Sequence, residues 1–178
     1  PMCSFLTQRH MLNEYTINRT QSHAASLIRD GMRIALAHSI TGVSWRMLRE
    51  VWEACHGEDK TPPGRMPGDT IAYINSGQSP LALATVVSVY LSAEKEHRSP
   101  VDAFMSAWET AKLFSEGSAA IDINAAWYAV RDVKSGLISW GHCKNCKAGF
   151  LLDTKQKKKI DCCPYCGTQD QKVLEVAQ

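Results

Sequence analysis

The sequence lacks any long uninterrupted apolar run. A membrane-spanning helix needs roughly 18 consecutive apolar residues, and no stretch of the 178-residue sequence approaches that length. Residues 1–11 also lack the apolar segment and the small-residue cleavage site of a signal peptide. We therefore expect a cytoplasmic protein, in which Met2 after the extra Pro1 is the natural start.

The sequence also lacks a recognisable catalytic set. There is no nucleophile elbow, phosphate-binding loop or metalloprotease motif. The six histidines are scattered singly along the chain, at positions 10, 23, 38, 56, 97 and 142. This pattern favours a protein that is not an enzyme, and it leaves binding functions to be considered.

Charge is distributed unevenly along the chain. Apolar residues make up 44% of the sequence, enough for one sizeable core. The net charge of +2 conceals a basic tail, because residues 142–178 hold seven lysines and four acidic residues. The rest of the chain carries one more acidic than basic residue. A basic tail is expected where a module meets a polyanion such as nucleic acid.

Helical patterns fill most of the chain before this tail. Apolar residues recur at helical spacing from Ser22 to about His38, which predicts one helix that continues through Gly31. A second helix follows Gly42 and ends at Gly57, with Ser44 as its N-terminal cap. Three prolines within residues 56–69 then predict an extended loop.

Three further helices are predicted beyond this loop. Ser79-Pro80 and Ser99-Pro100 each combine a capping serine with a proline at the first helical position, which predicts helices over residues 80–97 and 100–116. A last helix runs from Asp122 to Lys134 and ends near Gly136. Short strands are then expected over residues 137–140, 149–152, 158–161 and 172–176.

The predicted fold is therefore mainly α, with a small β module at the C-terminus. Residues 1–21 form an N-terminal arm, residues 22–138 a helical domain that contains a helix-turn-helix-like segment at 34–55, and residues 139–178 a zinc ribbon.

The cysteine spacing predicts the ribbon. Cys143 and Cys146 form one C-x2-C pair, and after sixteen residues Cys163 and Cys166 form another. This spacing is typical of a site in which four thiolates bind one structural zinc ion per chain and leave no position for a reactive water. Cys3 and Cys55 are then free thiols.

Three alternatives compete with this metal site. His142 or Cys162 can replace a neighbouring ligand, iron can take the place of zinc, or Cys163 and Cys166 can form a redox-active pair of thioredoxin type. The last alternative requires a βαβ unit around the pair, and the sequence does not predict one.

Two groups of basic residues are candidates for DNA contact. Six lysines lie on the ribbon, where they can bind phosphates without reading the sequence, or can simply be solvated: Lys144, Lys147, Lys155, Lys157, Lys158 and Lys159. Residues 42–52 suggest the turn and recognition helix of a helix-turn-helix, in which Arg46 and Arg49 face base edges. An ordinary helical hairpin with two exposed arginines is equally compatible with that segment.

Taken together, ordered segments of this sequence resemble the FlhC family of flagellar transcriptional activators. The resemblance covers residues 22–167 and rests on the order of its parts, namely LIRDGMR at 27–33, SWRMLREVW at 44–52, PPGRMP at 62–67, AWYAVRDVKSGL at 126–137 and the two cysteine pairs. The shorter C-terminus and the divergent middle resemble the relatives encoded by conjugative elements, AcaC and SetC.

The resemblance implies a specific function. Members of the family bind promoter DNA and recruit RNA polymerase in a hetero-oligomer with a small helical partner, FlhD, in an arrangement of four D-type and two C-type chains. The family's zinc ligands fall on the four cysteines chosen above. The expected function is thus a subunit that activates conjugative transfer genes, or flagellar genes. A zinc-ribbon scaffold that binds only proteins is the alternative, and a thiol oxidoreductase is a more distant one.

Overall fold

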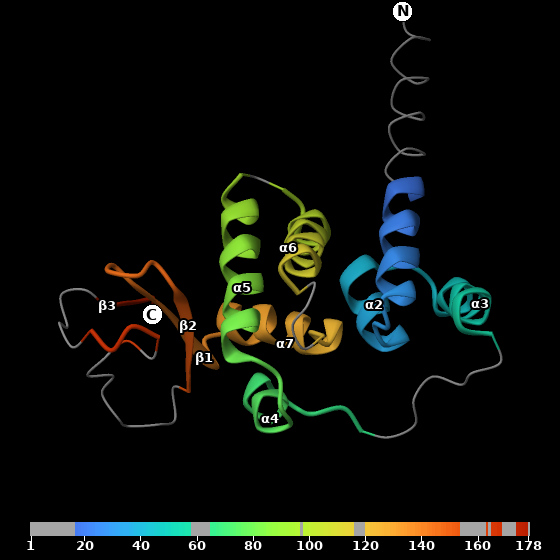
Figure 1. Ribbon diagram of the computed structural model, residues 1–178. Helices are drawn as coiled ribbons and strands as arrows, with labels where there is room; N and C mark the ends of the chain where they lie inside the picture. The colour runs from blue at the N-terminus through green and yellow to red at the C-terminus, as the bar shows by residue number, and fades with distance from the viewer. Residues whose placement is uncertain are drawn as a thin grey trace, which may run out of the picture. The chain divides into compact units, whose positions relative to one another are not determined.

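The computed structural model describes residues 17–57, 65–96, 98–115, 120–153, 163, 165–168 and 174–177. The chain divides into two compact units, Pro1–Gly64 and Arg65–Gln178. Helices dominate both units, and a small sheet lies near the C-terminus of the second (Figure 1). The expected fold class is confirmed. The division into arm, helical domain and ribbon stays a prediction.

In the first unit, the single helix expected over residues 22–38 is wrong, because the segment forms two helices. Residues 17–29 are helical, and α2 (Ile34–Thr41) follows after a turn. Gly31 adopts a left-handed φ of 94°. The amide of Gly31 donates to the Ile28 carbonyl at 3.0 Å, and the amide of Met32 donates to the Leu27 carbonyl at 2.9 Å. These bonds form a Schellman motif, which ends a helix and requires the backbone freedom of glycine.

Helix α3 (Trp45–His56) begins and ends as the sequence predicts. The Ser44 hydroxyl accepts a hydrogen bond from the Met47 amide at 3.4 Å, and Gly57 closes the helix with a φ of 66°. Leu48 and Trp52 are buried. The His56 ring donates from Nε2 to the Ile28 carbonyl at 2.9 Å, and this bond ties the end of α3 to the helix over residues 17–29.

Four helices build the second unit: α4 (Thr70–Asn75), α5 (Pro80–Lys95), α6 (Pro100–Ser115) and α7 (Ile123–Lys134). Both predicted serine caps are confirmed, since Ser79 accepts from the Ala82 amide at 3.3 Å and Ser99 from the Asp102 amide at 3.2 Å. Helix α4 was not predicted from the sequence. Asp69 caps this short helix by accepting from the Ala72 amide at 2.8 Å.

A buried carboxylate joins α7 to the start of α4. Asp132 is fully buried, and its Oδ2 accepts from the amide of Thr70 at 2.8 Å and from the Thr70 hydroxyl at 2.7 Å. Its Oδ1 pairs with the Arg131 guanidinium at 2.6 Å. Arg131 also donates to the Gly68 carbonyl at 3.0 Å. These bonds fix the segment that enters α4 against the helix that leads into the sheet.

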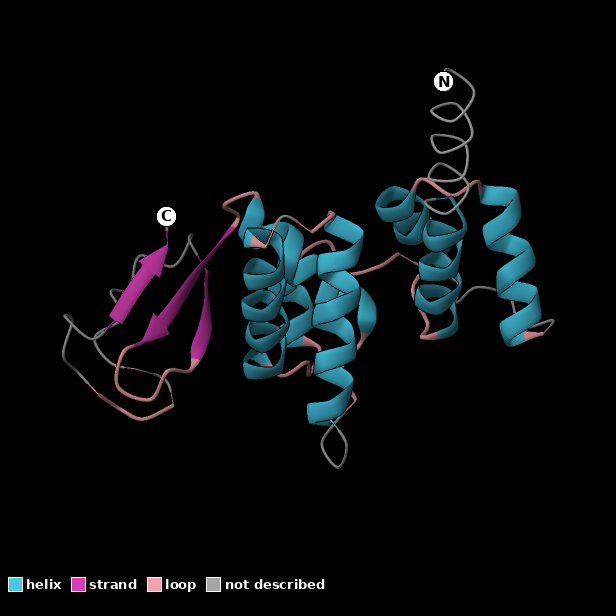
Figure 2. Ribbon diagram, turned by 90° about the horizontal axis from the view of Figure 1, so that it is seen from above, coloured by secondary structure: helices cyan, strands magenta, loops and turns pink. Residues whose placement is uncertain are grey.

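The sheet has three antiparallel strands in the order β2-β1-β3, with bounds Ile138–Cys143 for β1, Gly149–Asp153 for β2 and Leu174–Ala177 for β3 (Figure 2). Strand β1 is longer than the predicted 137–140 and ends at Cys143. The predicted strand 149–152 is confirmed. The predicted strand 158–161 lies outside the described residues.

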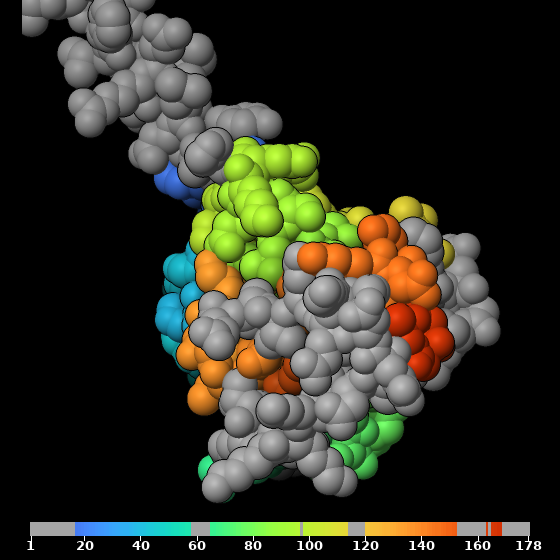
Figure 3. Space-filling model, turned by 90° about the vertical axis from the view of Figure 1, so that its left-hand side faces the viewer, coloured from blue at the N-terminus to red at the C-terminus, as the bar shows by residue number. Residues whose placement is uncertain are grey.

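The sheet packs against the helices of its own unit. Strand β2 contacts α5, and β1 contacts α7; Figure 3 shows described ribbon residues in orange and red beside the green residues of α5. Because β1 starts directly after the left-handed Gly136 that ends α7, the helix sets the position of the first cysteine pair. Among the described helices, none is both long enough and apolar enough to span a bilayer.

Candidate metal centre

Both cysteine pairs lie in turns with the same backbone hydrogen bonds. In the first turn, the Cys143 amide donates to the Ala148 carbonyl at 3.0 Å, and the Lys147 amide donates to the Cys143 carbonyl at 2.8 Å. In the second, Cys163 donates to the Thr168 carbonyl at 2.9 Å, and Gly167 donates to the Cys163 carbonyl at 3.0 Å. The chain thus builds the same knuckle twice.

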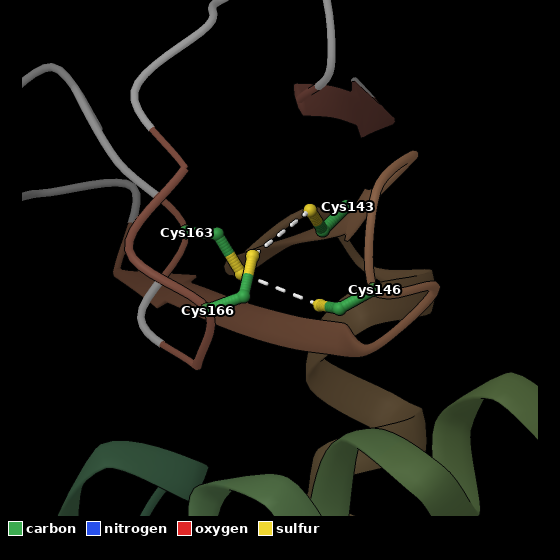
Figure 4. Close-up of side chains that lie close together, drawn as sticks. All are labelled: Cys143, Cys146, Cys163 and Cys166. Carbon is green, nitrogen blue, oxygen red and sulfur yellow. Dashed lines mark hydrogen bonds between the residues drawn. The ribbon is translucent and has the colours of Figure 1, made fainter.

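The four sulfur atoms of these knuckles converge on one point (Figure 4). All four lie within 4.8 Å of one another. The Cys143 and Cys166 sulfurs are 3.8 Å apart, and the Cys146 and Cys163 sulfurs are 3.7 Å apart. A tetrahedral zinc ion with Zn–S bonds of about 2.3 Å places its sulfurs roughly 3.8 Å apart. The donor set and its spacing therefore fit a zinc site with four cysteine ligands.

Burial divides the four cysteines into two classes. The first cysteine of each pair, Cys143 and Cys163, is buried together with Phe150 in a small apolar cluster. The second of each pair, Cys146 and Cys166, is exposed. Four thiolates close the coordination sphere of a zinc ion, so the site suits a structural role.

The pKa values of the two exposed thiols shift in opposite directions. Hydrogen bonds from the Thr168 side chain and backbone lower the pKa of Cys166 to about 6. For Cys146, a hydrogen bond with the Ala148 backbone lowers the pKa, but desolvation and the hydrogen bonds with the other three thiols outweigh it and raise the pKa to about 11. A metal ion bound by all four cysteines must displace every thiol proton that remains.

The geometry argues against two of the alternatives. The His142 ring stacks on the Trp140 ring at a centroid distance of 5.7 Å, and alternation along β1 turns it away from the face that Cys143 occupies. Cys163 and Cys166 lie in a turn like that of the first pair, whereas a thioredoxin-type pair opens a helix. Cys162 lies outside the described residues.

The two glycines that follow the cysteine pairs have different roles. Gly167 takes the left-handed conformation, with a φ of 69°. In the first knuckle, Lys147 holds that conformation with a φ of 62°, and Gly149 does not. Instead, a Cβ on Gly149 would lie 3.3 Å from the Trp140 indole. Glycine at 149 is therefore explained by close packing against this ring.

The left-handed Lys147 leads to a prediction. Replacing Lys147 by glycine is expected to stabilise the ribbon by about 0.5–1 kcal/mol, because the strain of a side chain at this φ exceeds the entropy that glycine loses on folding. Denaturant unfolding of the metal-loaded protein measures the effect. The control is Lys144→Gly in the same knuckle, which lacks a positive φ and should lose stability. A loss of similar size in both variants would contradict the argument.

The predicted DNA-contacting residues belong to different units. Lys144 and Lys147 are exposed on the first knuckle, and the other four, Lys155, Lys157, Lys158 and Lys159, lie outside the described residues. Arg46 and Arg49 are exposed on α3 in the first unit. Arg46 donates from Nε to Glu50 at 3.0 Å, so its guanidinium already has an acidic partner.

Two polar residues beside the sulfurs were not predicted from the sequence. Asn145 and Thr168 both lie within hydrogen-bonding distance of the Cys166 sulfur, at 3.8 Å for Asn145 Nδ2 and 3.1 Å for the Thr168 hydroxyl. Aligning the two knuckles residue by residue would have flagged Thr168, since the equivalent Ala148 has no hydroxyl.

Comparison with known proteins gives consistent matches. The sequence matches the family described as Flagellar transcriptional activator (FlhC) over residues 7–173. It is similar to the flagellar transcriptional regulator FlhC of Erwinia tasmaniensis, with 26% identity over 148 residues, which cover 80% of this chain and 82% of that protein. The family match thus includes α2 and α3 of the first unit and both knuckles of the second.

Proposed function

This chain belongs to the FlhC family of flagellar transcriptional activators, and we propose that it is a transcriptional activator subunit that binds promoter DNA in the cytoplasm. The observation that carries the proposal is the extent of the family match, which includes the described elements of both units up to the second knuckle. The similarity to a flagellar transcriptional regulator also covers most of the chain. The role is that of a DNA-binding protein and not of an enzyme.

One zinc ion per chain is part of the proposal. The ligands are Cys143, Cys146, Cys163 and Cys166, whose sulfurs lie within 4.8 Å of one another. Zinc bound by four thiolates supplies folding free energy and no reactive water. DNA contacts come from side chains of the protein, because the first knuckle places Lys144 and Lys147 on the exposed surface beside the cluster.

We further propose that the ribbon lysines bind phosphates and that α3 contributes contacts to bases. The exposed Lys144 and Lys147 can bind the phosphate backbone of DNA, a contact that does not depend on the base sequence. On α3, Arg49 is the stronger candidate for a base edge, because Arg46 is paired with Glu50. We propose phosphate contacts also for four lysines outside the described residues: Lys155, Lys157, Lys158 and Lys159.

The proposed partner is a small helical protein of the FlhD type, in a hetero-oligomer of four such chains with two of these, which recruits RNA polymerase. Large apolar side chains are exposed in both units, among them Ile17 and Trp45 in the first and Leu113 in the second. Exposed apolar surface of this kind is typical of proteins that are buried in an assembly.

The experiment that tests the function uses the complex. The chain is co-expressed with the neighbouring FlhD-like gene, and the purified complex is titrated against promoter and random DNA over a range of salt, with zinc per chain recorded. Selective, salt-dependent binding supports the activator. A zinc-loaded complex that is indifferent to DNA would overturn it. Promoters of conjugative transfer genes and of flagellar genes, tested side by side, decide which set the protein activates.

Substitutions separate the two kinds of DNA contact. Arg49→Ala is expected to cost about 1–3 kcal/mol on the promoter and little on random DNA, whereas Lys144→Ala should weaken binding to both alike and reduce the salt slope by about one. Fluorescence anisotropy with both DNAs at several salt concentrations measures this. Equal losses on both DNAs for Arg49→Ala would remove α3 from base recognition.

One observation favours a second function for α3. Its exposed face carries Glu50 and Glu53 beside Arg46 and Arg49, so its charges balance. A balanced surface suits a protein partner better than a phosphate backbone. The scaffold alternative therefore predicts that Arg49→Ala weakens assembly with the partner, which gel filtration of the complex detects.

A further inference from the structure

The two knuckles share a backbone but differ around their exposed sulfurs. Superposing the turns by sequence places Asn145 opposite Tyr165 and Ala148 opposite Thr168. Only the second knuckle therefore has a hydroxyl two residues after its last cysteine. Only the first has a carboxamide between its two cysteines.

These two polar side chains meet at one sulfur. Asn145 donates from Nδ2 to the Thr168 hydroxyl oxygen at 3.0 Å and also approaches the Cys166 sulfur at 3.8 Å. The Thr168 hydroxyl lies 3.1 Å from the same sulfur. When Cys166 is a thiolate, as metal binding requires, it has no proton to donate. The chain of donors therefore runs from Asn145 to Thr168 to Cys166.

We propose that Asn145 and Thr168 are positioning residues of the metal centre, which hold the Cys166 sulfur in its ligating position and slow the loss of the metal. The inference rests on the zinc site of the proposed function. It goes beyond that function because it assigns roles to two residues that bind neither metal nor DNA.

The position of Cys166 explains why such support is needed. Cys143 and Cys163 are buried in the apolar cluster with Phe150, where water and chelators do not reach them. Cys166, like Cys146, is exposed, and the ligands that are open to water are those at which a chelator can begin to remove the metal. Donors that face a thiolate stabilise its charge and fix its direction.

Asn145 adds a second effect, because it connects the two knuckles directly. The residues it joins are 23 positions apart in the sequence, and the bond between Asn145 and Thr168 involves neither metal nor sulfur. This bond therefore links the two halves of the folded site independently of the sulfurs. Because Thr168→Val removes this bond as well as the contact with the Cys166 sulfur, it should speed metal release at least as much as Asn145→Ala.

The test compares variants in the co-expressed, zinc-loaded complex. Thr168→Val removes the hydroxyl at nearly constant volume, Thr168→Ser keeps it, and Asn145→Ala removes the upstream donor. Thr110→Val is the matched control, because its hydroxyl donates to the Ser106 carbonyl within α6, away from the sulfurs. Zinc affinity and release are measured by competition with a chromogenic chelator. The Co²⁺-loaded proteins report the charge on the sulfurs through their sulfur-to-metal charge-transfer band.

We expect Thr168→Val and Asn145→Ala to weaken zinc affinity roughly 10–100-fold, as is usual for outer-sphere partners of a metal. Thr168→Ser and Thr110→Val should stay near the parent. The charge-transfer band should shift in Thr168→Val but not in Thr110→Val. The double variant should lose little more than Thr168→Val, because Asn145 acts partly through Thr168.

The outcomes are distinguishable. A parent protein that binds no zinc would overturn the metal centre itself. A parent that binds zinc, together with a Thr168→Val variant that matches Thr110→Val in affinity, release and spectrum, would overturn only the positioning role. If Thr168→Val does not fold, Asn145→Ala and Thr168→Ser decide: weakening in the first with none in the second supports the proposal, and the reverse overturns it.

Discussion

Replacing Cys163 by serine is expected to leave the chain without zinc and to unfold the ribbon. The reason is the size of the apolar cluster in the described sheet, which consists of Cys143, Phe150 and Cys163 with Leu152 packed against it. So small a core does not hold a three-stranded sheet together. In zinc-finger peptides the metal supplies about 10–16 kcal/mol at neutral pH, far more than this cluster provides.

The loss should extend beyond the sheet. Strand β2 packs against α5 and β1 against α7, so an unfolded ribbon exposes helix surface that the folded sheet covers. We expect the Cys163→Ser complex to contain no zinc, to unfold at a lower temperature and to bind promoter DNA poorly. Atomic absorption, a thermal melt and a DNA titration measure the three effects on one preparation.

The matched control is Cys55→Ser. Cys55 is an exposed free thiol on α3, in the other unit, and its replacement should leave zinc content, melting temperature and DNA affinity unchanged. A soluble Cys163→Ser variant that retains zinc and DNA affinity would show that the four sulfurs do not act as one site.

The four-cysteine cluster was predictable because its signal is local. Two C-x2-C pairs single out the four cysteines from spacing alone, and the structure brings their sulfurs together. The helix caps were predictable for the same reason: Ser44, Ser79 and Ser99 each act through an amide three residues away. Interactions within one turn leave their mark in the nearby sequence.

Other features of the structure are not determined by the local sequence. Apolar residues on both sides of Gly31 keep helical spacing, so periodicity predicts one helix, whereas the backbone turns at Gly31 and starts a second. The need for glycine at position 149 is not local either. It depends on the Trp140 ring, which reaches Gly149 only because β1 and β2 pair. Packing across strands is not visible in the spacing of glycines.

The helix α4 was missed for a related reason. It is only six residues long, and its N-terminus is fixed by Asp132, which lies 62 positions later in the chain. Propensity alone does not sustain so short a helix in water. The buried Asp132 carboxylate holds α4 in place through its hydrogen bonds with Thr70, so removing this carboxylate should have a large effect.

Replacing Asp132 by alanine is expected to destabilise the second unit by about 1–3 kcal/mol, the usual cost of leaving buried hydrogen-bond donors without an acceptor. The Arg131 side chain is 38% exposed, so water can solvate the charge that it leaves unpaired. Both carboxylate oxygens are engaged. One accepts two hydrogen bonds from Thr70, which is itself fully buried, and the other pairs with Arg131. Alanine would leave the Thr70 amide and hydroxyl without an acceptor, in a place that water does not reach.

The loss of stability should be greatest in the segments that the Asp132 carboxylate connects. Arg131 donates to the Gly68 carbonyl and lies 4.0 Å above the Tyr128 ring, so loss of its ion pair loosens the entry to α4 as well as α7. Zinc content should stay at one per chain, because the four sulfurs belong to the knuckles. Denaturant unfolding of the complex, followed by zinc analysis of the folded fraction, separates this effect from that of Cys163→Ser.

The control for Asp132 is an exposed carboxylate. Glu109 pairs with Lys112 at 2.8 Å on the surface of α6, and Glu109→Ala should cost no more than about 0.5 kcal/mol. Asp132→Asn should lie between the two, since it keeps one acceptor oxygen and loses the charge. If Asp132→Ala were no more costly than Glu109→Ala, then α4 would be held by its apolar contacts alone, and the Asp69 cap rather than the buried carboxylate would define where it begins.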